Sequence, residues 1–186
     1  PTSNSSKRVD AHALREGRCP RALLPSSLVR SALSLHRHHR SVYRRSDIQC
    51  VIDPASIALI GASPTPTSLA HQTHLNLRDF AGPLYLVNSR YQKIGDADCY
   101  ASISELPAVP ECAVLAIGRD LVVPVAEECA ARGVKGLVIY AAGFAETGEA
   151  ERIEQQTRLA ALARESGMRI VGPNCPGVIS PGLSNV

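Results

Sequence analysis

The chain has 186 residues, of which 45% are hydrophobic and only 4% aromatic, and its net charge at pH 7 is +3. Residues 1–50 carry a net charge of +7, whereas residues 51–186 carry −4. A nucleic-acid-binding fold holds its basic patch on the folded domain itself, and no apolar run approaches the roughly 18 residues that span a bilayer. The composition therefore excludes a nucleic-acid partner and a membrane partner.

The six cysteines form no C-x-x-C pair and show no short regular spacing. Such a pattern fits small core residues in a reducing compartment better than a disulfide framework or a zinc site. The sequence therefore predicts a cytoplasmic protein without a bound metal.

Residues 1–50 are rich in Ser, Arg and His, and we expect them to form a disordered basic leader outside the fold. Two other interpretations stay open. An Arg- and Ser-rich, acid-poor leader is typical of a mitochondrial transit peptide, and His36, His38 and His39 could together bind a metal ion. The folded domain is expected to cover residues 51–186.

The first signal of the fold is the stretch 54–70. Ser56–Ile60 is a short apolar run typical of a strand buried on both faces. It ends at Gly61-Ala62-Ser63, and Ser68 is a suitable N-cap for a helix over residues 69–80. A strand, a small-residue turn and a helix start together favour phosphate binding, although the full G-x-G-x-x-G spacing is absent.

Strand and helix signals then alternate along the chain. Further strands are predicted at 84–87, 112–117, 136–140 and 168–171, helices at 120–131 and 147–166, and a short helical turn at 103–106, after a polar loop. Strands joined by helices form right-handed crossovers and a parallel sheet. The sequence therefore predicts an α/β, Rossmann-like parallel sheet of about five strands with helices on both faces.

In such a sheet the ligand lies beyond the carboxyl ends of the strands. The loops expected at that edge cover residues 61–68, 88–93, 118–120, 141–146 and 172–177. Four of these five contain glycine where the strand stops, which predicts a binding rim.

The end of the second strand discriminates between nucleotide ligands. An NAD-binding domain places an Asp or Glu there to bind the ribose hydroxyls, but this strand is followed by Asn88-Ser89-Arg90, with Lys93 close behind. A guanidinium binds phosphate in a bidentate manner, so Arg90 favours an adenosine ribose that carries an extra phosphate. NADP and coenzyme A (CoA) both fit.

The series IALIGAS, GPLYLVNSRY, CYASISELPAVPECAVLAI, AAGFAETGE and RIVGPNCPGVISP resembles, in order and spacing, the CoA-binding domain of the NDP-forming acyl-CoA synthetases. The resemblance covers roughly residues 53–181. It implies a part in the reaction acid + CoA + ATP ⇌ acyl-CoA + ADP + phosphate. It also implies CoA or acyl-CoA as ligand, and an ATP-grasp domain or subunit and a phosphohistidine domain as partners, neither of which this chain is expected to contain.

The resemblance also assigns residues of the site. It implies that Gly61, Ala62, Ser63 and Ser68 contact the CoA phosphates, and that Asn88 and Arg90 or Lys93 approach the adenosine end. It also implies backbone contacts along the rim from Gly118, Ala142 and Gly143. The thiol end would lie near Asn174 and Cys175. No catalytic residue is assigned, because Cys175 has no evident His partner and the family does not use it as a nucleophile.

Two other functions remain open from the residues. One is an NADP-binding oxidoreductase domain, because NADP also carries a phosphate on its adenosine ribose. The other is a non-catalytic module that senses CoA.

Overall fold

The computed structural model describes residues 44–180 and 184–185, all of which belong to one compact unit, Val42–Val186. The predicted disordered leader and the histidine run at 36–39 lie almost wholly outside the described residues. In the part of the chain that is described, no helix is both long and apolar enough to cross a membrane.

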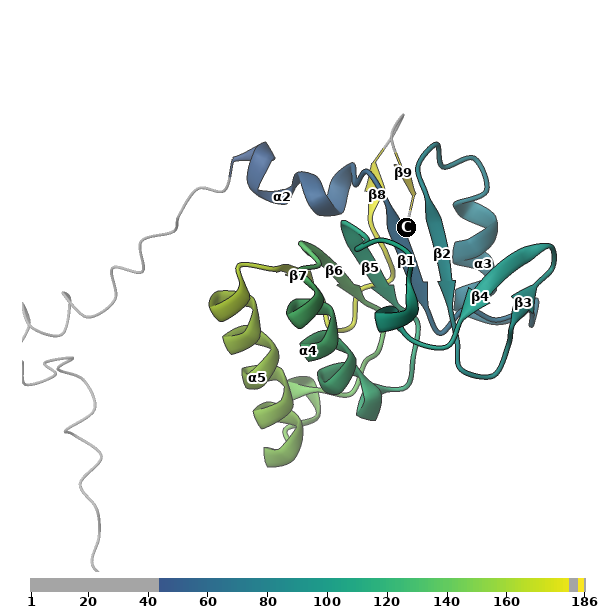
Figure 1. Ribbon diagram of the computed structural model, residues 1–186. Helices are drawn as coiled ribbons and strands as arrows, with labels where there is room; N and C mark the ends of the chain where they lie inside the picture. Colours follow the sequence, from purple (N-terminus) through teal and green to yellow (C-terminus); the bar gives the residue numbers. More distant parts are fainter. Residues whose placement is uncertain (1–43, 181–183, 186) are drawn as a thin grey trace, which may run out of the picture. The chain divides into compact units, whose positions relative to one another are not determined.

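The unit is built on a seven-stranded sheet with the order β3-β4-β2-β1-β5-β6-β7 (Figure 1). Every neighbouring pair is parallel except β3 and β4. The strands are β1 (Ile57–Ile60), β2 (Leu84–Val87), β3 (Lys93–Ile94), β4 (Ala97–Tyr100), β5 (Cys112–Leu115), β6 (Gly136–Ile139) and β7 (Arg169–Val171). A separate antiparallel pair joins β8 (Ile179–Ser180) to β9 (Ser184–Asn185). The Rossmann-like prediction is confirmed.

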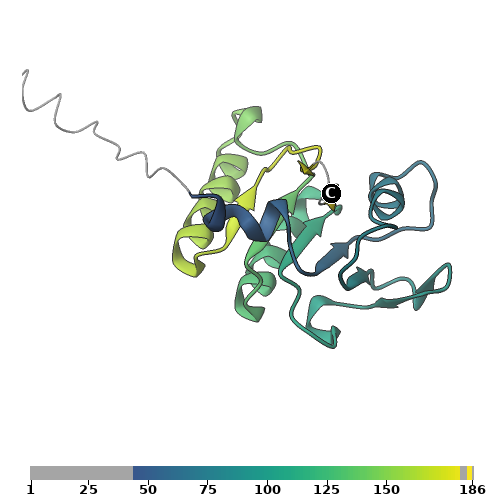
Figure 2. The same cartoon turned by 90° about the horizontal axis from the view of Figure 1, so that it is seen from above.

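Helices cover both faces of the sheet, as predicted. The helix that links β1 to β2, α3 (Leu69–Asn76), lies on one side of the strands, and α4 (Val122–Arg132) and α5 (Ala150–Ser166) lie together on the other (Figure 2). Short 3₁₀ turns complete the connections: η1 (Ile103–Glu105), η2 (Arg119–Leu121) and η3 (Ala145–Thr147).

Strand β1 shows how the two faces of the sheet form two cores. All four of its residues are buried. Successive side chains of a strand point to opposite faces, so Ala58 and Ile60 pack in the core under α4 and α5, while Ile57 and Leu59 pack in the core on the other face. A continuous apolar run is therefore what this central strand requires.

The structure has a helix across residue 50, where the folded domain was expected to begin. This helix is α2 (Arg45–Ile52), and its residues Cys50 and Val51 are buried against the sheet face opposite α4 and α5. The contact with the sheet is close, because a Cβ atom at Gly136 on β6 would lie 2.5 Å from the Cys50 carbonyl oxygen. The Asp47 carbonyl also accepts a hydrogen bond of 3.0 Å from the Arg169 guanidinium.

The polar loop that was expected after Tyr91 contains a hairpin instead. Strands β3 and β4 pair antiparallel with Lys93 opposite Asp98, and β4 adds to β2 in parallel. The buried residues of this hairpin are Ile94 on β3 and Cys99 on β4. Two apolar residues among charged ones carry too weak an alternation to predict a strand, so the number of strands was underestimated.

Several helix boundaries also differ from the prediction. Helix α4 begins at Val122 rather than at residue 120, because Asp120 belongs to η2. Helix α3 ends at Asn76 rather than at residue 80, and α5 begins at Ala150 rather than at residue 147, because Thr147 belongs to η3. The ends of helices are the positions at which sequence patterns discriminate least.

Because α2 belongs to the folded unit, truncating its buried face should destabilise the protein. Val51 is 2% exposed, and Val51→Ala removes two buried carbon atoms and leaves a cavity, so we expect a loss of about 2 kcal/mol in the free energy of unfolding. Urea denaturation followed by circular dichroism measures this loss. Ile48→Ala, at a residue of the same helix that is 39% exposed, should cost less than half as much. Equal losses would show that α2 is not packed as described.

Candidate functional site

The strand register brings four chain segments together at one edge of the sheet. Ile60 of β1 is paired with Val87 of β2 and with Leu115 of β5, and Leu115 is paired with Ile139 of β6. Four neighbouring parallel strands therefore end level with one another. The residues that follow them lie side by side at this edge: Gly61, Asn88, Ala116 and Tyr140.

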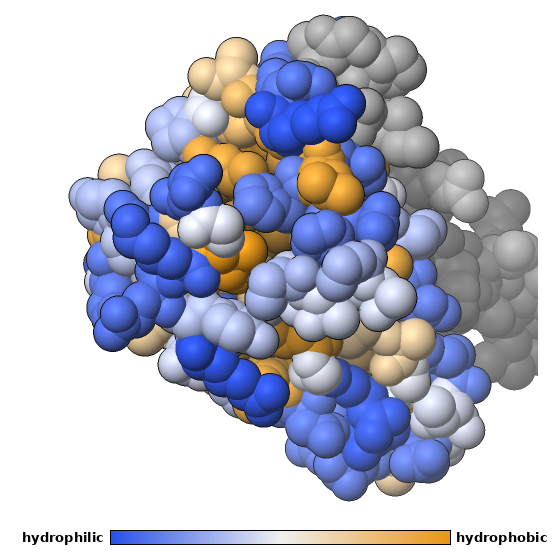
Figure 3. Space-filling model, turned by 90° about the vertical axis from the view of Figure 1, so that its right-hand side faces the viewer, coloured by the Kyte–Doolittle hydropathy of each residue, from blue (hydrophilic) through white to orange (hydrophobic). Residues whose placement is uncertain are grey.

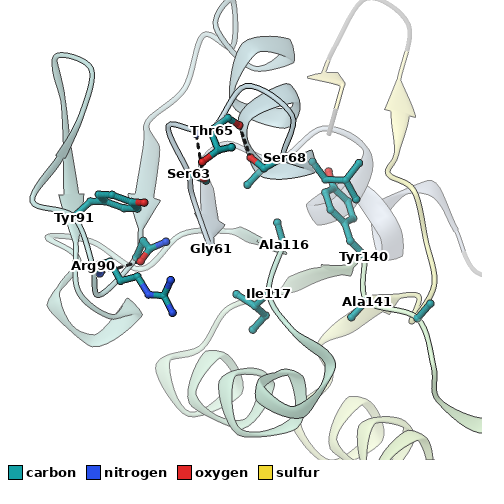
Figure 4. A pocket seen from close by; sticks show the side chains of 14 residues that line it. Gly61, Ser63, Thr65, Ser68, Arg90, Tyr91, Ala116, Ile117, Tyr140 and Ala141 are labelled. Atoms are coloured by element: carbon teal, nitrogen blue, oxygen red, sulfur yellow. Dashed lines mark hydrogen bonds between the residues drawn. The ribbon is translucent and has the colours of Figure 1, made fainter.

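This edge contains the topological switch point of the sheet, where the chain leaves β1 toward β2 on one side and returns to β5 on the other. Open α/β sheets bind their ligands at such a point. A cavity of about 640 Å³ lies here. It is lined by Gly61, Ser63, Thr65, Ser68, Leu69, Ala70, Asn88, Arg90, Tyr91, Ala116, Ile117, Tyr140, Ala141 and Ala142. In Figure 4, Arg90 and Tyr91 lie on one side of the hollow and Tyr140 on the opposite side, with Ile117 between them.

Gly61 is required by the turn at the end of β1. Its φ is +89°, a left-handed conformation that other residues rarely adopt, and an added Cβ would meet the backbone oxygen of Ala116, the residue that follows β5. The glycine therefore allows the β1 turn and the β5 segment to approach each other closely beside the cavity.

Two backbone amides of this turn, those of Gly61 and Ala62, already have an acceptor within the sheet. The N–H groups of Gly61 and Ala62 both donate to the Val87 carbonyl, at 2.8 and 3.2 Å. Ala62 is 1% exposed and does not line the cavity, and its carbonyl accepts a bond of 2.8 Å from the side-chain amide of Asn88. Its observed role is to hold β1 and β2 together.

The start of α3 supplies amides that remain available. The Ser68 hydroxyl caps the helix by accepting from the His71 N–H at 3.1 Å, and it donates to the Thr65 carbonyl at 2.9 Å. The first amides of a helix have no intrahelical acceptor, and those of Leu69 and Ala70 belong to residues that line the cavity. The positive end of the helix dipole adds to the attraction for an anion.

Arg90 brings the cationic group that the sequence predicts for this edge. The Asn88 side-chain oxygen accepts a bond of 2.9 Å from the Arg90 N–H, which fixes the turn after β2. The exposed guanidinium points into the hollow toward Ile117 (Figure 4). Among the described residues, no carboxylate lies within 4.0 Å of it.

Lys93, the alternative cation, is placed differently. It lies on β3 and not among the residues that line the cavity, and its amino group is 3.7 Å from the Asp98 carboxylate. Both side chains are largely exposed, so the pair is weak. Arg90 is therefore the better placed of the two cations.

Tyr140 closes the opposite side of the cavity and was not predicted. Its hydroxyl lies 2.9 Å from the Thr73 hydroxyl on α3. Burial raises the pKa of Tyr140 above its ordinary value, so the phenol stays neutral. Its position at the carboxyl end of a predicted strand was a signal. The hydrogen bond to α3 could be found only from the fold.

Other residues that line the cavity were also not predicted, because their orientation depends on the fold. Thr65 and Tyr91 lie in loops that were predicted to border the site, and Leu69 and Ile117 directly adjoin such loops. Their exact orientation depends on how each loop leaves its strand, which residue types alone do not determine.

Gly118 and Gly143 follow β5 and β6 but do not line the cavity. The carbonyl of Gly143 accepts from the Arg119 guanidinium at 3.3 Å, and its N–H donates to the Glu146 carboxylate at 2.7 Å. The same carboxylate accepts from the Phe144 N–H at 3.0 Å. The backbone of Gly143 is therefore used within its own loop, whereas Ala142 lines the cavity.

Glu146 should make the stability of this loop depend on pH. The backbone N–H of Gly143, followed by other amides and Arg119, lowers the pKa of Glu146 below its ordinary value of 4.5. A carboxyl group with a lowered pKa stabilises the fold above the ordinary value, and this contribution is lost as the pH falls through the folded-state pKa. Melting temperatures measured from pH 6 to pH 3 should therefore fall less steeply for Glu146→Gln than for the unmodified chain. Parallel curves would contradict this role.

Asn174 and Cys175 lie beside the cavity without lining it. Their N–H groups donate to the carbonyls of Ala141 and Ile139, at 2.8 and 3.1 Å, so the chain after β7 runs along the end of β6. The Cys175 thiol lies 3.3 Å from the Gly177 carbonyl, to which it donates.

No group of three or more potential metal ligands occurs within residues 44–180 and 184–185. The histidines for which a metal ion was considered, at 36–39, lie outside that part.

A doubly wound sheet, with a cavity at its switch point bordered by a glycine turn, a helix start and an unpaired arginine, places the protein in the Rossmann-like class, in which this position is where nucleotides bind. The sequence matches the CoA-binding domain family over residues 55–181. The chain therefore belongs to this family.

Its relatives are larger enzymes. It is 38% identical over 129 residues to the α subunit of ADP-forming acetate–CoA ligase II from Pyrococcus furiosus, covering 69% of this chain and 28% of that protein. It is 40% identical over 137 residues to a trans-feruloyl-CoA synthase from an unknown prokaryotic organism, and the match covers 73% of this chain and 19% of that protein. The apo form of a dinucleotide-forming acetyl-coenzyme A synthetase 1 from Candidatus Korarchaeum cryptofilum superposes with a TM-score of 0.68 at 31% identity. The superposition covers 74% of this chain and 30% of that protein. The chain thus spans less than a third of each of these proteins.

Proposed function

We propose that this chain binds coenzyme A in the cavity at the switch point. The phosphate on the adenosine ribose pairs with Arg90, and the pyrophosphate lies at the start of α3 with Ser63 and Ser68. The pantetheine arm then runs toward Tyr140 and the loop that contains Asn174 and Cys175.

The observation that carries this proposal is the unpaired guanidinium of Arg90, which points into a cavity that also receives the positive end of α3. An arginine without a carboxylate partner at a ligand cavity is suited to bind a phosphate. The start of α3 provides a second anion site within the same cavity. Two separate anion sites match a ligand with a ribose phosphate and a pyrophosphate.

NADP carries the same two kinds of phosphate, but membership of the CoA-binding domain family favours CoA. The relatives are named as ADP-forming acetate–CoA ligases and a feruloyl-CoA synthase. We infer that the chain serves as the CoA-binding part of a cytoplasmic NDP-forming acyl-CoA synthetase. The ATP-grasp and phosphohistidine domains would then be supplied by other domains or subunits, and the reaction would be acid + CoA + ATP ⇌ acyl-CoA + ADP + phosphate.

Calorimetric titration of the 186-residue chain with CoA and with NADPH, under the same conditions, tests the ligand. CoA should bind with micromolar affinity and raise the melting temperature as its concentration increases, and NADPH should bind at least tenfold more weakly. Stronger binding of NADPH would contradict the proposal and favour an oxidoreductase domain.

A further inference from the structure

A second cavity, of about 690 Å³, borders the proposed CoA cavity. It lies between α3 and the segment that follows Cys175. It is lined by Leu69, Gln72, Thr73, Leu75, Asn76, Arg78, Asp79, Tyr140, Pro176 and Gly177. Only two residues, Leu69 and Tyr140, line both cavities.

Tyr140 is fixed in its position between the two cavities. Its backbone N–H donates to the Leu115 carbonyl at 3.2 Å, and its hydroxyl lies 2.9 Å from the Thr73 hydroxyl. Thr73 is 5% exposed and also donates to the Leu69 carbonyl at 2.9 Å. The phenol ring is therefore held at both ends, by β5 through its backbone and by α3 through its hydroxyl. It forms a wall at the end of the CoA cavity that lies opposite Arg90 (Figure 4).

One side of the second cavity is apolar and suits an aliphatic group, whereas Gln72, Thr73 and Asn76 add polar side chains to its lining. Leu69 and Leu75 are exposed on α3, at 67% and 45%, and Pro176 faces the same space. The only charged side chains of the lining, Arg78 and Asp79, pair with each other at 3.4 Å. The side of the molecule on which α3 lies shows apolar patches between hydrophilic residues (Figure 3).

We infer that Tyr140 determines which acyl-CoA this chain accepts. This inference rests on the proposed function, because CoA bound with its adenosine end at Arg90 directs its thioester toward Tyr140. The ring ends the CoA cavity there and restricts the acyl group to a short chain. Beyond the ring, the second cavity offers space for a longer aliphatic chain along Leu69, Leu75 and Pro176, and it becomes continuous with the first when the ring is removed.

The test compares the dissociation constants of CoA and octanoyl-CoA, measured by calorimetry on the 186-residue chain. We expect octanoyl-CoA to bind more weakly than CoA to the unmodified chain. Tyr140→Ala should improve the affinity for octanoyl-CoA relative to CoA by about tenfold or more, the usual effect of admitting methylene groups to an apolar pocket. Tyr140→Phe keeps the ring and loses only the hydroxyl. The ratio of its dissociation constants for octanoyl-CoA and CoA should therefore stay within about twofold of that of the unmodified chain.

The outcomes separate this inference from the proposed function. If Tyr140→Ala and Tyr140→Phe gave the same ratio, Tyr140 would not limit the acyl chain, even though CoA still bound. If the unmodified chain did not bind CoA, the proposed function itself would be wrong. Should Tyr140→Ala fail to fold, Tyr140→Leu removes most of the ring, keeps an apolar side chain, and should shift the ratio in the same direction.

Discussion

Arg90→Ala is expected to weaken the binding of CoA by about tenfold while leaving dephospho-CoA within about twofold of its original affinity. The guanidinium forms a charge-assisted hydrogen bond with the ribose phosphate, and such bonds contribute about 1.5–3 kcal/mol. Arg90 is exposed, so screening by solvent reduces the effect to just below this range, about 1.4 kcal/mol or one factor of ten. Titration of each variant with both ligands measures the difference.

Lys93→Ala is the matched control for Arg90. It also removes one positive charge from the segment after β2, but Lys93 pairs with Asp98 and does not line the cavity. Lys93→Ala should change the affinities for CoA and for dephospho-CoA by less than about twofold. Equal losses of CoA and dephospho-CoA in Arg90→Ala, or an equal effect of Lys93→Ala, would exclude a contact between Arg90 and the ribose phosphate.

Gly61→Ala is expected to destabilise the fold by about 3 kcal/mol. A left-handed conformation costs a residue with a Cβ about 1–2 kcal/mol, and the added atom must also displace the Ala116 backbone or the Ile117 side chain, which costs about 1–3 kcal/mol more. For a folded unit of this size, the melting temperature should fall by roughly 10 °C. Binding of CoA to the folded fraction should weaken as well, because the turn borders the cavity.

Gly118→Ala provides the comparison for Gly61. Gly118 has an ordinary φ of −62°, and an added Cβ would have no neighbour within 4 Å. The melting temperature of the Gly118→Ala variant should therefore differ from that of the unmodified chain by less than about 2 °C. A substitution in open space at an allowed backbone conformation has little effect on stability. A similar loss in both variants would contradict the special role of the turn at Gly61.

The sheet could be predicted from the sequence because its central strands are short apolar runs, such as Ser56–Ile60 before Gly61. The parts that were missed lack such a signal. Helix α2 lies where the basic leader meets the fold, and its burial depends on Gly136, some 80 residues further along the chain. The β3–β4 hairpin buries only Ile94 and Cys99, too few residues to produce a period of two.

The site was predicted in outline for a related reason. Parallel strands end at one edge, so the loops that carry Ser68 and Arg90 could be assigned to the same cavity from their order alone. The sequence could not indicate which backbone groups are already occupied. The Val87 carbonyl takes both the Gly61 and the Ala62 amides, and this follows from the register of β1 against β2. The bond between Tyr140 and Thr73 likewise depends on how α3 packs on the sheet.

A crystal structure of the 186-residue chain with CoA tests the central claim most directly, because it places every part of the ligand at once. We predict that the phosphate on the adenosine ribose lies within hydrogen-bonding distance of the Arg90 guanidinium, with the pyrophosphate at the start of α3 and the thiol toward Tyr140. A complex in which CoA binds outside this cavity, or in which Arg90 contacts no phosphate, would contradict the account.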